Sequence, residues 1–179
     1  MKPTERIETE RLLLRKPHAD DAEAIFRRYA GDAEVTRYLS WPTHRRLEQT
    51  QAFLEWSDED WERWPAGSYL IFERGDENRL LGGTGLSFQT PTLAVTGYVF
   101  ARDAWGQGFA TEALEAMVRL GRGTGLKRIA AVCHPEHRPS ARVLEKCGFL
   151  LDEMRRDKLE FPNLKPKKRW NVLTYVRNL

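Results

Sequence analysis

A glycine-bearing turn between residues 97 and 113 has the residue types that bind phosphate. The segment reads GYVFARDAWGQGFATEA, a pattern that predicts a strand, a tight turn and the start of a helix. Gly106 and Gly108 allow the backbone to turn sharply and to approach a ligand. The unpaired N–H groups at a helix start attract anions, and the Thr111 hydroxyl can add a donor. The segment predicts a pyrophosphate site, although a helix start with incidental glycines explains the same letters.

Two other phosphate-binding motifs do not fit this turn. A P-loop needs Gly-Lys followed by Ser or Thr, and the turn contains no lysine. The dinucleotide-binding fingerprint needs a third glycine, where this chain has Thr111. Both motifs are therefore excluded. Glu112, in the first helical turn, would repel an anion only if its side chain faced the turn.

A second motif, CHPEHRPSARVLEKCGF at residues 133–149, gives the turn a context. Together the two motifs resemble the GNAT acetyltransferases, specifically the RimJ/RimL type. That family commonly has Trp-Gly-x-Gly-x-Ala-Thr-Glu-Ala in its cofactor loop and Asn-x-x-Ser-x-x-x-Leu-Glu-Lys-x-Gly-Phe downstream. The opening TERLLLR at 9–15 also resembles the usual start of the family. The resemblance runs over nearly the whole chain and is weakest from Asp152 onward.

The resemblance implies an enzyme that uses acetyl-CoA as its co-substrate. The implied fold is α/β (α+β), with a central mixed, mostly antiparallel sheet of about seven strands flanked by about four helices. A splay between strands 94–101 and 128–133 would admit the pantetheine arm, with the thioester carbonyl near a strand amide. Backbone groups of Phe100 and Ala101 would pair with that arm. The amides expected to hold the pyrophosphate are those of Trp105, Gly106, Gln107, Gly108, Phe109 and Ala110.

Two side chains of the second motif are implied to act beside the cofactor. Ser140 matches the serine that this subgroup places near the CoA sulfur as a general acid. A helix-start serine bonded to local backbone is the alternative. His137 stands where the family usually has an asparagine that contacts the cofactor arm or an ordered water. Histidine can replace that hydrogen bond, but it is bulkier than asparagine.

Hydrophobic periodicity predicts the elements that hold these residues. A helix capped by Asp20, with Glu23 in a capping box, is expected to stop at Gly31. Three strands over 68–101 read as an antiparallel meander, and a helical crossover then predicts that 128–133 runs parallel to 94–101. Strands are predicted at 9–15, 68–74, 80–88, 94–101, 128–133, 149–153 and 170–176, and helices at 20–31, 45–64, 108–122 and 139–147.

Composition predicts one globular domain spanning residues 1–179. Hydrophobic residues make up 41% and charged residues 31% of the chain, which is too apolar for a disordered protein. There is no apolar stretch of membrane-spanning length and no apolar centre of a secretion signal at the start, so a cytoplasmic protein is expected. A net charge of +3 without a basic, aromatic-interleaved stripe argues against nucleic-acid binding. The protein is expected to be a monomer or a homodimer.

The two cysteines, Cys133 and Cys147, are predicted to be buried thiols. They are too few for a disulfide framework and lack the paired spacing of a structural zinc site. Cys133, His134 and His137 crowd around a proline and lack an evident fourth ligand. No metal is therefore expected.

The acceptor is predicted to be a primary amine, most simply an α-amine. At pH 7 an α-amine is roughly a tenth neutral, whereas a lysine is neutral about four times in ten thousand. An α-amine therefore asks less of a general base. Glu73, Glu160 and Tyr98 are candidates for the base by position only, and a water chain is a further alternative.

Three functions stay open from the sequence. The first is acetylation of the α-amine of a protein, peptide or small amino compound. The second is acetylation of an antibiotic, polyamine or other metabolite amine, and the third is a non-catalytic CoA-binding sensor. The loop at 161–169 either shapes acceptor choice or holds solvated charges. The aromatic residues that form either an acceptor wall or core are Trp41, Trp56, Trp61, Trp64, Tyr69, Phe72 and Phe88.

Overall fold

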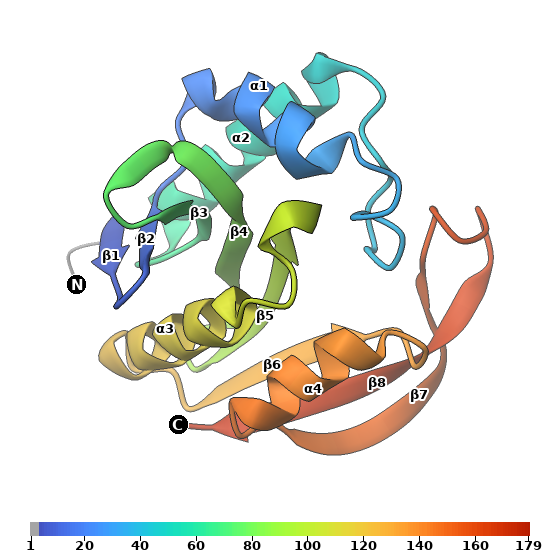
Figure 1. The fold of residues 1–179 in the computed structure, drawn as a ribbon. Coiled ribbons are helices and arrows are strands. Elements are labelled where there is room, and N and C mark those ends of the chain that lie inside the picture. Colours follow the sequence, from blue (N-terminus) through green and yellow to red (C-terminus); the bar gives the residue numbers. More distant parts are fainter. Residues whose placement is uncertain (1–3) are drawn as a thin grey trace.

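A computed structural model of the chain describes residues 4–179, except for the side chains of 155–157. Within these residues the chain forms one eight-stranded sheet in the order β1-β2-β3-β4-β5-β6-β8-β7 (Figure 1). Every neighbouring pair is antiparallel except β5 and β6, which run parallel. The strands are β1 Arg6–Glu8, β2 Leu12–Arg15, β3 Ser68–Glu73, β4 Asp76–Thr90, β5 Leu93–Phe100, β6 Arg128–Cys133, β7 Leu150–Glu160 and β8 Arg169–Asn178.

Four α-helices flank the sheet in the described part of the chain, as the GNAT resemblance implies. They are α1 Ala22–Ile25, α2 Leu47–Arg63, α3 Phe109–Gly123 and α4 Arg138–Lys146. Short 3-10 turns at Ala19–Asp21 and Arg102–Ala104 precede α1 and α3, and a π-helical segment, Phe26–Ala30, continues α1 as far as Gly31. None of the described helices has the length and apolar character needed to cross a membrane.

The meander and its crossover are confirmed. β3, β4 and β5 pair in sequence, and α3 leads from β5 to its parallel neighbour β6. The final strand, β8, inserts between β6 and β7, so its neighbours are β6 and β7. Alternation along the chain does not predict this insertion, because it depends on which strand edge remains open after the crossover.

The N-terminal segment differs from its prediction in two places. Residues 9–15 are not one strand, because the chain turns at Thr9, whose N–H donates to the Leu12 carbonyl at 2.9 Å. This turn creates the extra strand β1. The first helical turn begins at Ala19 rather than at an Asp20 cap, and Asp21 accepts from the His18 N–H at 2.7 Å.

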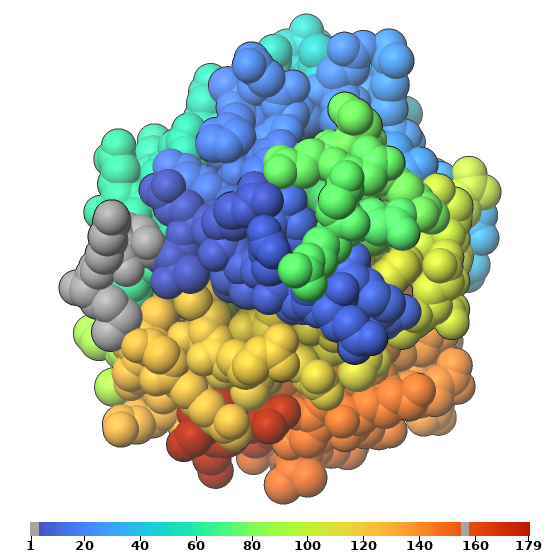
Figure 2. Space-filling view, turned by 60° about the vertical axis from the view of Figure 1, so that its left-hand side comes forward, coloured from blue at the N-terminus to red at the C-terminus, as the bar shows by residue number. Residues whose placement is uncertain are grey.

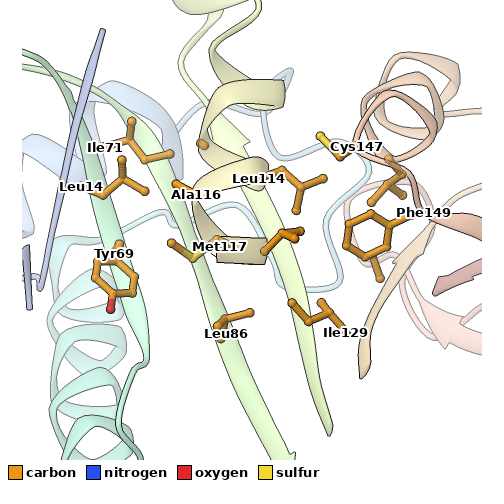
Figure 3. Packing of buried hydrophobic residues seen from close by; sticks show 14 of the residues in the cluster. Leu14, Tyr69, Ile71, Leu86, Leu114, Ala116, Met117, Ile129, Cys147 and Phe149 are labelled. Carbon is orange, nitrogen blue, oxygen red and sulfur yellow. The ribbon is translucent and has the colours of Figure 1, made fainter. Parts of the chain in front are cut away.

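Two apolar clusters lie on opposite faces of the sheet. Leu12 and Leu14 belong to the cluster under α3 and α4, whereas Leu13 between them belongs to the cluster under α1 and α2. This is the alternation expected of a strand buried on both faces. In Figure 3, Leu114 and Met117 of α3 lie among sheet residues on one side and the end of α4 on the other. The helix predicted at 108–122 is confirmed as α3, in which Ala113, Leu114, Met117 and Gly121 are buried and Ala110 is partly buried.

The N-terminus of α3 is fixed to the β1–β2 turn through Glu112. Its carboxylate accepts from the Thr9 hydroxyl at 2.6 Å, the Arg11 N–H at 2.8 Å and the Arg11 Nε at 2.7 Å. Figure 2 shows the dark blue N-terminal hairpin lying against the gold surface of α3. Burial by itself raises the pKa of Glu112, but these hydrogen bonds outweigh it and hold the pKa below its usual value.

We expect Glu112→Gln to lower the free energy of unfolding by about 2 kcal/mol at pH 7, because charge-assisted hydrogen bonds are lost. Because the pKa of Glu112 is lower in the folded than in the unfolded state, its carboxylate stabilises the fold fully at pH values above the unfolded-state pKa. This stabilisation is lost as the pH falls through the folded-state pKa. Urea unfolding of the wild type and of Glu112→Gln should therefore show a difference in the free energy of unfolding at pH 7 that becomes smaller toward pH 4. Glu115→Gln, on the exposed side of α3, is the matched control. A gap independent of pH would contradict the assignment.

Candidate active site

The parallel strands β5 and β6 separate partway along their length. They pair from Leu93 with Arg128 to Thr96 with Ala131, and the remaining residues of each strand do not pair with each other. The predicted splay is therefore present. Because β4 and β8 still hold the outer edges of these strands, the separation leaves backbone groups facing each other across an opening.

The backbone groups at this opening differ in part from the prediction. The Ala101 N–H donates to the Leu81 carbonyl at 2.9 Å, and the Ala101 carbonyl accepts from the Ala104 N–H at 3.0 Å. The Ala101 N–H is thus committed to another partner in this structure, and the Ala101 carbonyl keeps one further lone pair. Successive residues of a strand direct their N–H and C=O groups to opposite edges, so Tyr98 and Phe100 face the opening. The Phe100 carbonyl accepts from the Trp105 indole at 2.7 Å. The backbone groups left to pair with a ligand in the opening are therefore the Phe100 N–H and the N–H and C=O of Tyr98.

The glycine turn presents a row of free amides. Gly106 and Gly108 adopt positive φ angles of 73° and 81°, and residues 105–108 are exposed. The Trp105 N–H closes a short turn onto the Arg102 carbonyl at 3.1 Å, so this amide is not among the free ones in the structure. The N–H groups of residues 106–111 have no acceptor among the described residues, and the first helical bond comes from Glu112 to the Gly108 carbonyl. This row combines helix-start polarity with open space in front of it.

Arg11 supports this turn from the side. Its Nη1 donates to the Gln107 carbonyl at 2.9 Å, and its guanidinium lies 4.8 Å from the centre of the Phe109 ring. The same guanidinium pairs with Glu112, whose carboxylate therefore faces the β1–β2 turn and not the free amides. The anion-repelling orientation considered for Glu112 is absent, so the row keeps its positive polarity.

The opening leads into a cavity of about 680 Å³. The β5–β6 end of the cavity is lined by Gly97, Tyr98, Val132, Cys133, His137 and Ser140. The other end, under α2 and the 32–46 loop that joins α1 to α2, is lined mainly by apolar and aromatic side chains, with His44 and Asp60 among them. Sequence reasoning missed Tyr38 and His44, because the 32–46 loop has no periodic pattern and only the fold brings it over the sheet. It also missed Asp60 of α2, because only the fold turns that helix toward the cavity.

Ser140 and Tyr98 form a hydroxyl pair at the β5–β6 end. The Tyr98 hydroxyl lies 3.0 Å from Ser140 Oγ and 2.9 Å from the Ser140 carbonyl. The Ser140 hydroxyl thus has a partner across the cavity wall rather than only local backbone. Burial raises the pKa of Tyr98 well above its usual value, which keeps the phenol protonated at neutral pH. Tyr98 is therefore a donor there and not a general base.

The two acidic candidates for the base lie away from this end. Glu73 pairs with Arg79 at the end of β3, outside the cavity lining. Glu160 is exposed at the end of β7 and also outside the lining. Neither position brings a carboxylate to Ser140, so neither prediction is supported by the geometry.

His137 belongs to an aromatic group at the corner between β6 and α4. Its ring stacks on Tyr38 at a centroid distance of 4.8 Å and an interplanar angle of 18°. Burial, with a smaller contribution from nearby His134, lowers the pKa of His137 below its usual value. His134 is itself buried against Tyr38, Phe161 and Trp170. The corner thus connects the 32–46 loop to the segment before β8.

The predicted loop at 161–169 contacts the same 32–46 loop through Asn163. The Asn163 amide donates to the Thr36 carbonyl at 2.7 Å and the Trp41 carbonyl at 2.9 Å, and its oxygen accepts from the Thr43 N–H at 2.8 Å. The Asn163 side chain therefore holds the 161–169 loop against the 32–46 loop, which lies over one end of the cavity. The sequence gives no sign of this, because the partners are about 120 residues apart.

The aromatic residues predicted to form either an acceptor wall or core are divided between the cavity lining and the core. Trp41 and Trp56 line the cavity, whereas Trp61 and Phe72 are buried in the core. Trp64 stacks on Phe88, and Tyr69 is a core residue that also lines the cavity.

Cys133 and Cys147 are buried free thiols, as predicted, and burial raises the pKa of each to about 11. In the described part of the chain, no group of three His, Cys, Asp or Glu residues is arranged to hold a metal ion.

Known proteins place this geometry in a family. The model of the acetyltransferase (GNAT) domain matches residues 11–150. The uncharacterised N-acetyltransferase YoaA of Bacillus subtilis (strain 168) is 34% identical over 151 residues, which cover 80% of this chain and 81% of YoaA. The crystal structure of a GNAT acetyltransferase from Bacillus anthracis has a TM-score of 0.83 at 28% identity, with 97% of this chain and 98% of that chain covered.

The structure of RimL, a ribosomal alpha-N-protein acetyltransferase in complex with coenzyme A, shares the fold. Its TM-score is 0.84 at 22% identity, and 98% of each chain is covered. The opened strand pair, the glycine turn at the start of α3 and the matched family model agree with one another. The chain belongs to the GNAT family of acetyltransferases and is an N-acetyltransferase.

Proposed function

We propose that this protein transfers the acetyl group of acetyl-CoA to a primary amine by direct attack of the amine on the thioester. The acceptor in this proposal is an α-amine of a protein, peptide or small amino compound. The observation that carries the proposal is the row of free N–H groups at residues 106–111, exposed beside the opening between β5 and β6. A diphosphate held there has its pantetheine arm aimed at the cavity.

The cofactor contacts follow from the groups left without partners. The pyrophosphate is bound by the amides of Gly106 to Thr111, with the Thr111 hydroxyl as an additional donor. The pantetheine arm lies in the opening as an added strand and pairs with the Tyr98 backbone and the Phe100 N–H. The coenzyme A bound to RimL, which has the same fold, supports this class of cofactor.

The reaction takes place at the β5–β6 end of the cavity. A strand amide at the opening stabilises the negative charge that develops on the thioester oxygen as the amine attacks. Ser140 donates a proton to the leaving sulfur, and the Tyr98 hydroxyl, 3.0 Å away, orients Ser140 Oγ. Because Tyr98 stays protonated across the neutral range, it donates its one proton to the Ser140 carbonyl at 2.9 Å, and its oxygen can accept from the Ser140 hydroxyl.

An α-amine acceptor fits both the chemistry and the shape of the site. An α-amine has a pKa of about 7.7 to 8.0 against about 10.4 for lysine, so less help is needed to deprotonate it. The aromatic end of the cavity, with Trp41 and Trp56, suits an acceptor with an apolar group next to the amine. RimL is named as an α-N-acetyltransferase, and this name supports the same acceptor class.

The function itself is tested by supplying acetyl-CoA with a panel of amines and measuring release of the CoA thiol. Peptides with free α-amines should release thiol at least tenfold faster at pH 7 than N-blocked lysine peptides, polyamines or aminoglycosides. Mass spectrometry should find the acetyl group on the α-nitrogen. Faster turnover of a polyamine or an antibiotic would replace the proposed acceptor, and no amine-dependent release would leave a CoA-binding protein without turnover.

We expect Gly108→Glu to weaken acetyl-CoA binding more than 100-fold in calorimetry, because a carboxylate and its bulk enter the row of amides. Gly75→Glu is the matched control. Gly75 also has a positive φ, 89°, and open space around it, but it lies in the β3–β4 turn. Its variant carries the same strain and charge and should bind within twofold of the wild type. Equal affinity of the two variants would remove the loop from cofactor binding.

Ser140→Ala is expected to lower kcat about 10- to 100-fold while acetyl-CoA affinity changes less than threefold. The reason is that a proton donor to the leaving group acts in the transition state and not in cofactor binding. Tyr98→Phe should give a smaller fall in kcat, because it removes only the group that orients Ser140. Steady-state kinetics and calorimetry measure the two effects. Unchanged turnover in Ser140→Ala would exclude the serine from the mechanism.

A further inference from the structure

His137 has a free ring at the reacting end of the cavity. It follows β6 by four residues and precedes Ser140 by three, and both side chains line the cavity. Neither ring nitrogen of His137 has a hydrogen-bond partner among the side chains and backbone that the structure describes. The ring is nevertheless held in one orientation by its stacking on Tyr38. An imidazole that is fixed and unpartnered is able to exchange a proton with a bound ligand.

The other titratable groups of the cavity are less suited to that exchange. His44 and Asp60 lie toward the α2 end, and His44 Nδ1 is 2.8 Å from the Thr50 hydroxyl. Tyr98 holds its proton, and burial raises the pKa of the Cys133 thiol to about 11. Among the described residues that line the cavity, His137 is thus the neutral base at the same end as Ser140.

We propose that His137 is the general base that removes a proton from the acceptor ammonium. This inference rests on the proposed acetyl transfer. His137 accepts one proton from the ammonium and passes it to solvent, and the neutral amine then forms a bond to the thioester carbon. The C–S bond breaks, and the second proton of the attacking nitrogen reaches the departing sulfur through Ser140. The products are the amide and the CoA thiol.

The surroundings of His137 favour its neutral form before the amine arrives. Tyr38, from the 32–46 loop, covers one side of the ring, and the Arg37 guanidinium lies 5.4 Å from the Tyr38 ring centre. His134, in the same corner between β6 and α4, lies near the His137 ring. Cys133 of β6 and Tyr98 of β5 are protonated and uncharged. Asp60, at the other end, is the acidic group in the described cavity lining. Burial lowers the pKa of the imidazole, so the neutral form, which is able to take a proton, is the form present when the amine arrives.

The test compares His137→Asn and His137→Gln with the wild type over pH 5 to 9, using acetyl-CoA and the best amine of the panel. Asparagine is the residue that the related motif usually carries, and glutamine is a second variant in case one is unstable. Calorimetry measures acetyl-CoA affinity, and urea unfolding checks the fold. His18→Asn, an exposed histidine outside the cavity, is the control, and His44→Asn tests the competing cavity histidine.

We expect the His137 variants to lose about 10-fold in kcat/KM at pH 7, because roughly a tenth of an α-amine is already neutral there, and to bind acetyl-CoA within threefold of the wild type. Their rates should rise tenfold per pH unit up to the pKa of the amine, because only amine that is already neutral reacts. The wild type should instead level off above the pKa of His137, and His18→Asn should match it. Three outcomes would each overturn the assignment of His137 as the base. The His137 variants could keep the wild-type pH–rate profile, or they could lose only acetyl-CoA affinity. Alternatively, His44→Asn could show the pH–rate profile predicted for the His137 variants. In all three cases acetyl transfer by the wild type would leave the proposed function intact.

Discussion

The site depends on one interruption of backbone pairing. β5 and β6 bond to each other for four residue pairs and then separate, although each strand remains held on its other edge. A sheet normally satisfies every N–H and C=O of its inner strands, so an unsatisfied pair of edges inside a sheet needs another partner. An extended polyamide arm such as pantetheine is a partner of the right kind. The cavity, the hydroxyl pair and the glycine turn are all arranged around this opening.

The glycine turn is the second place where backbone groups lack partners. Two positive φ angles aim the amides of residues 106–111 outward, where solvent or an anion can reach them. Keeping such a turn rigid needs contacts from behind, and Arg11 supplies them through Glu112, the Gln107 carbonyl and the Phe109 ring. Glu112 thus stabilises the fold and also removes a negative charge from the anion site. Stability and ligand polarity are linked by one carboxylate.

The end of the cavity where we propose that the acceptor binds is formed by segments far apart in the chain. The 32–46 loop and the turn before β8 meet through Asn163, and Tyr38 of the first loop stacks on His137. This arrangement connects the walls that surround the acceptor to the corner that holds Ser140 and His137. Under the proposed function, a substitution in these loops that changes acceptor preference also alters the orientation of Ser140 and His137. Such coupling is the expected consequence of shaping a binding site with loops that also fix reacting groups.

Local patterns in the sequence determined the helices, the meander, the crossover and the glycine turn, because each depends on residues close together in the chain. Helix starts, glycine positions and apolar periodicity are properties of neighbouring side chains and survive without tertiary context. The motif positions of Ser140 and His137 were also fixed by local spacing. Only the tertiary structure decided the insertion of β8, the commitment of the Ala101 backbone and the roles of Tyr38, His44 and Asn163. These depend on contacts across tens of residues, which periodicity along the chain does not encode.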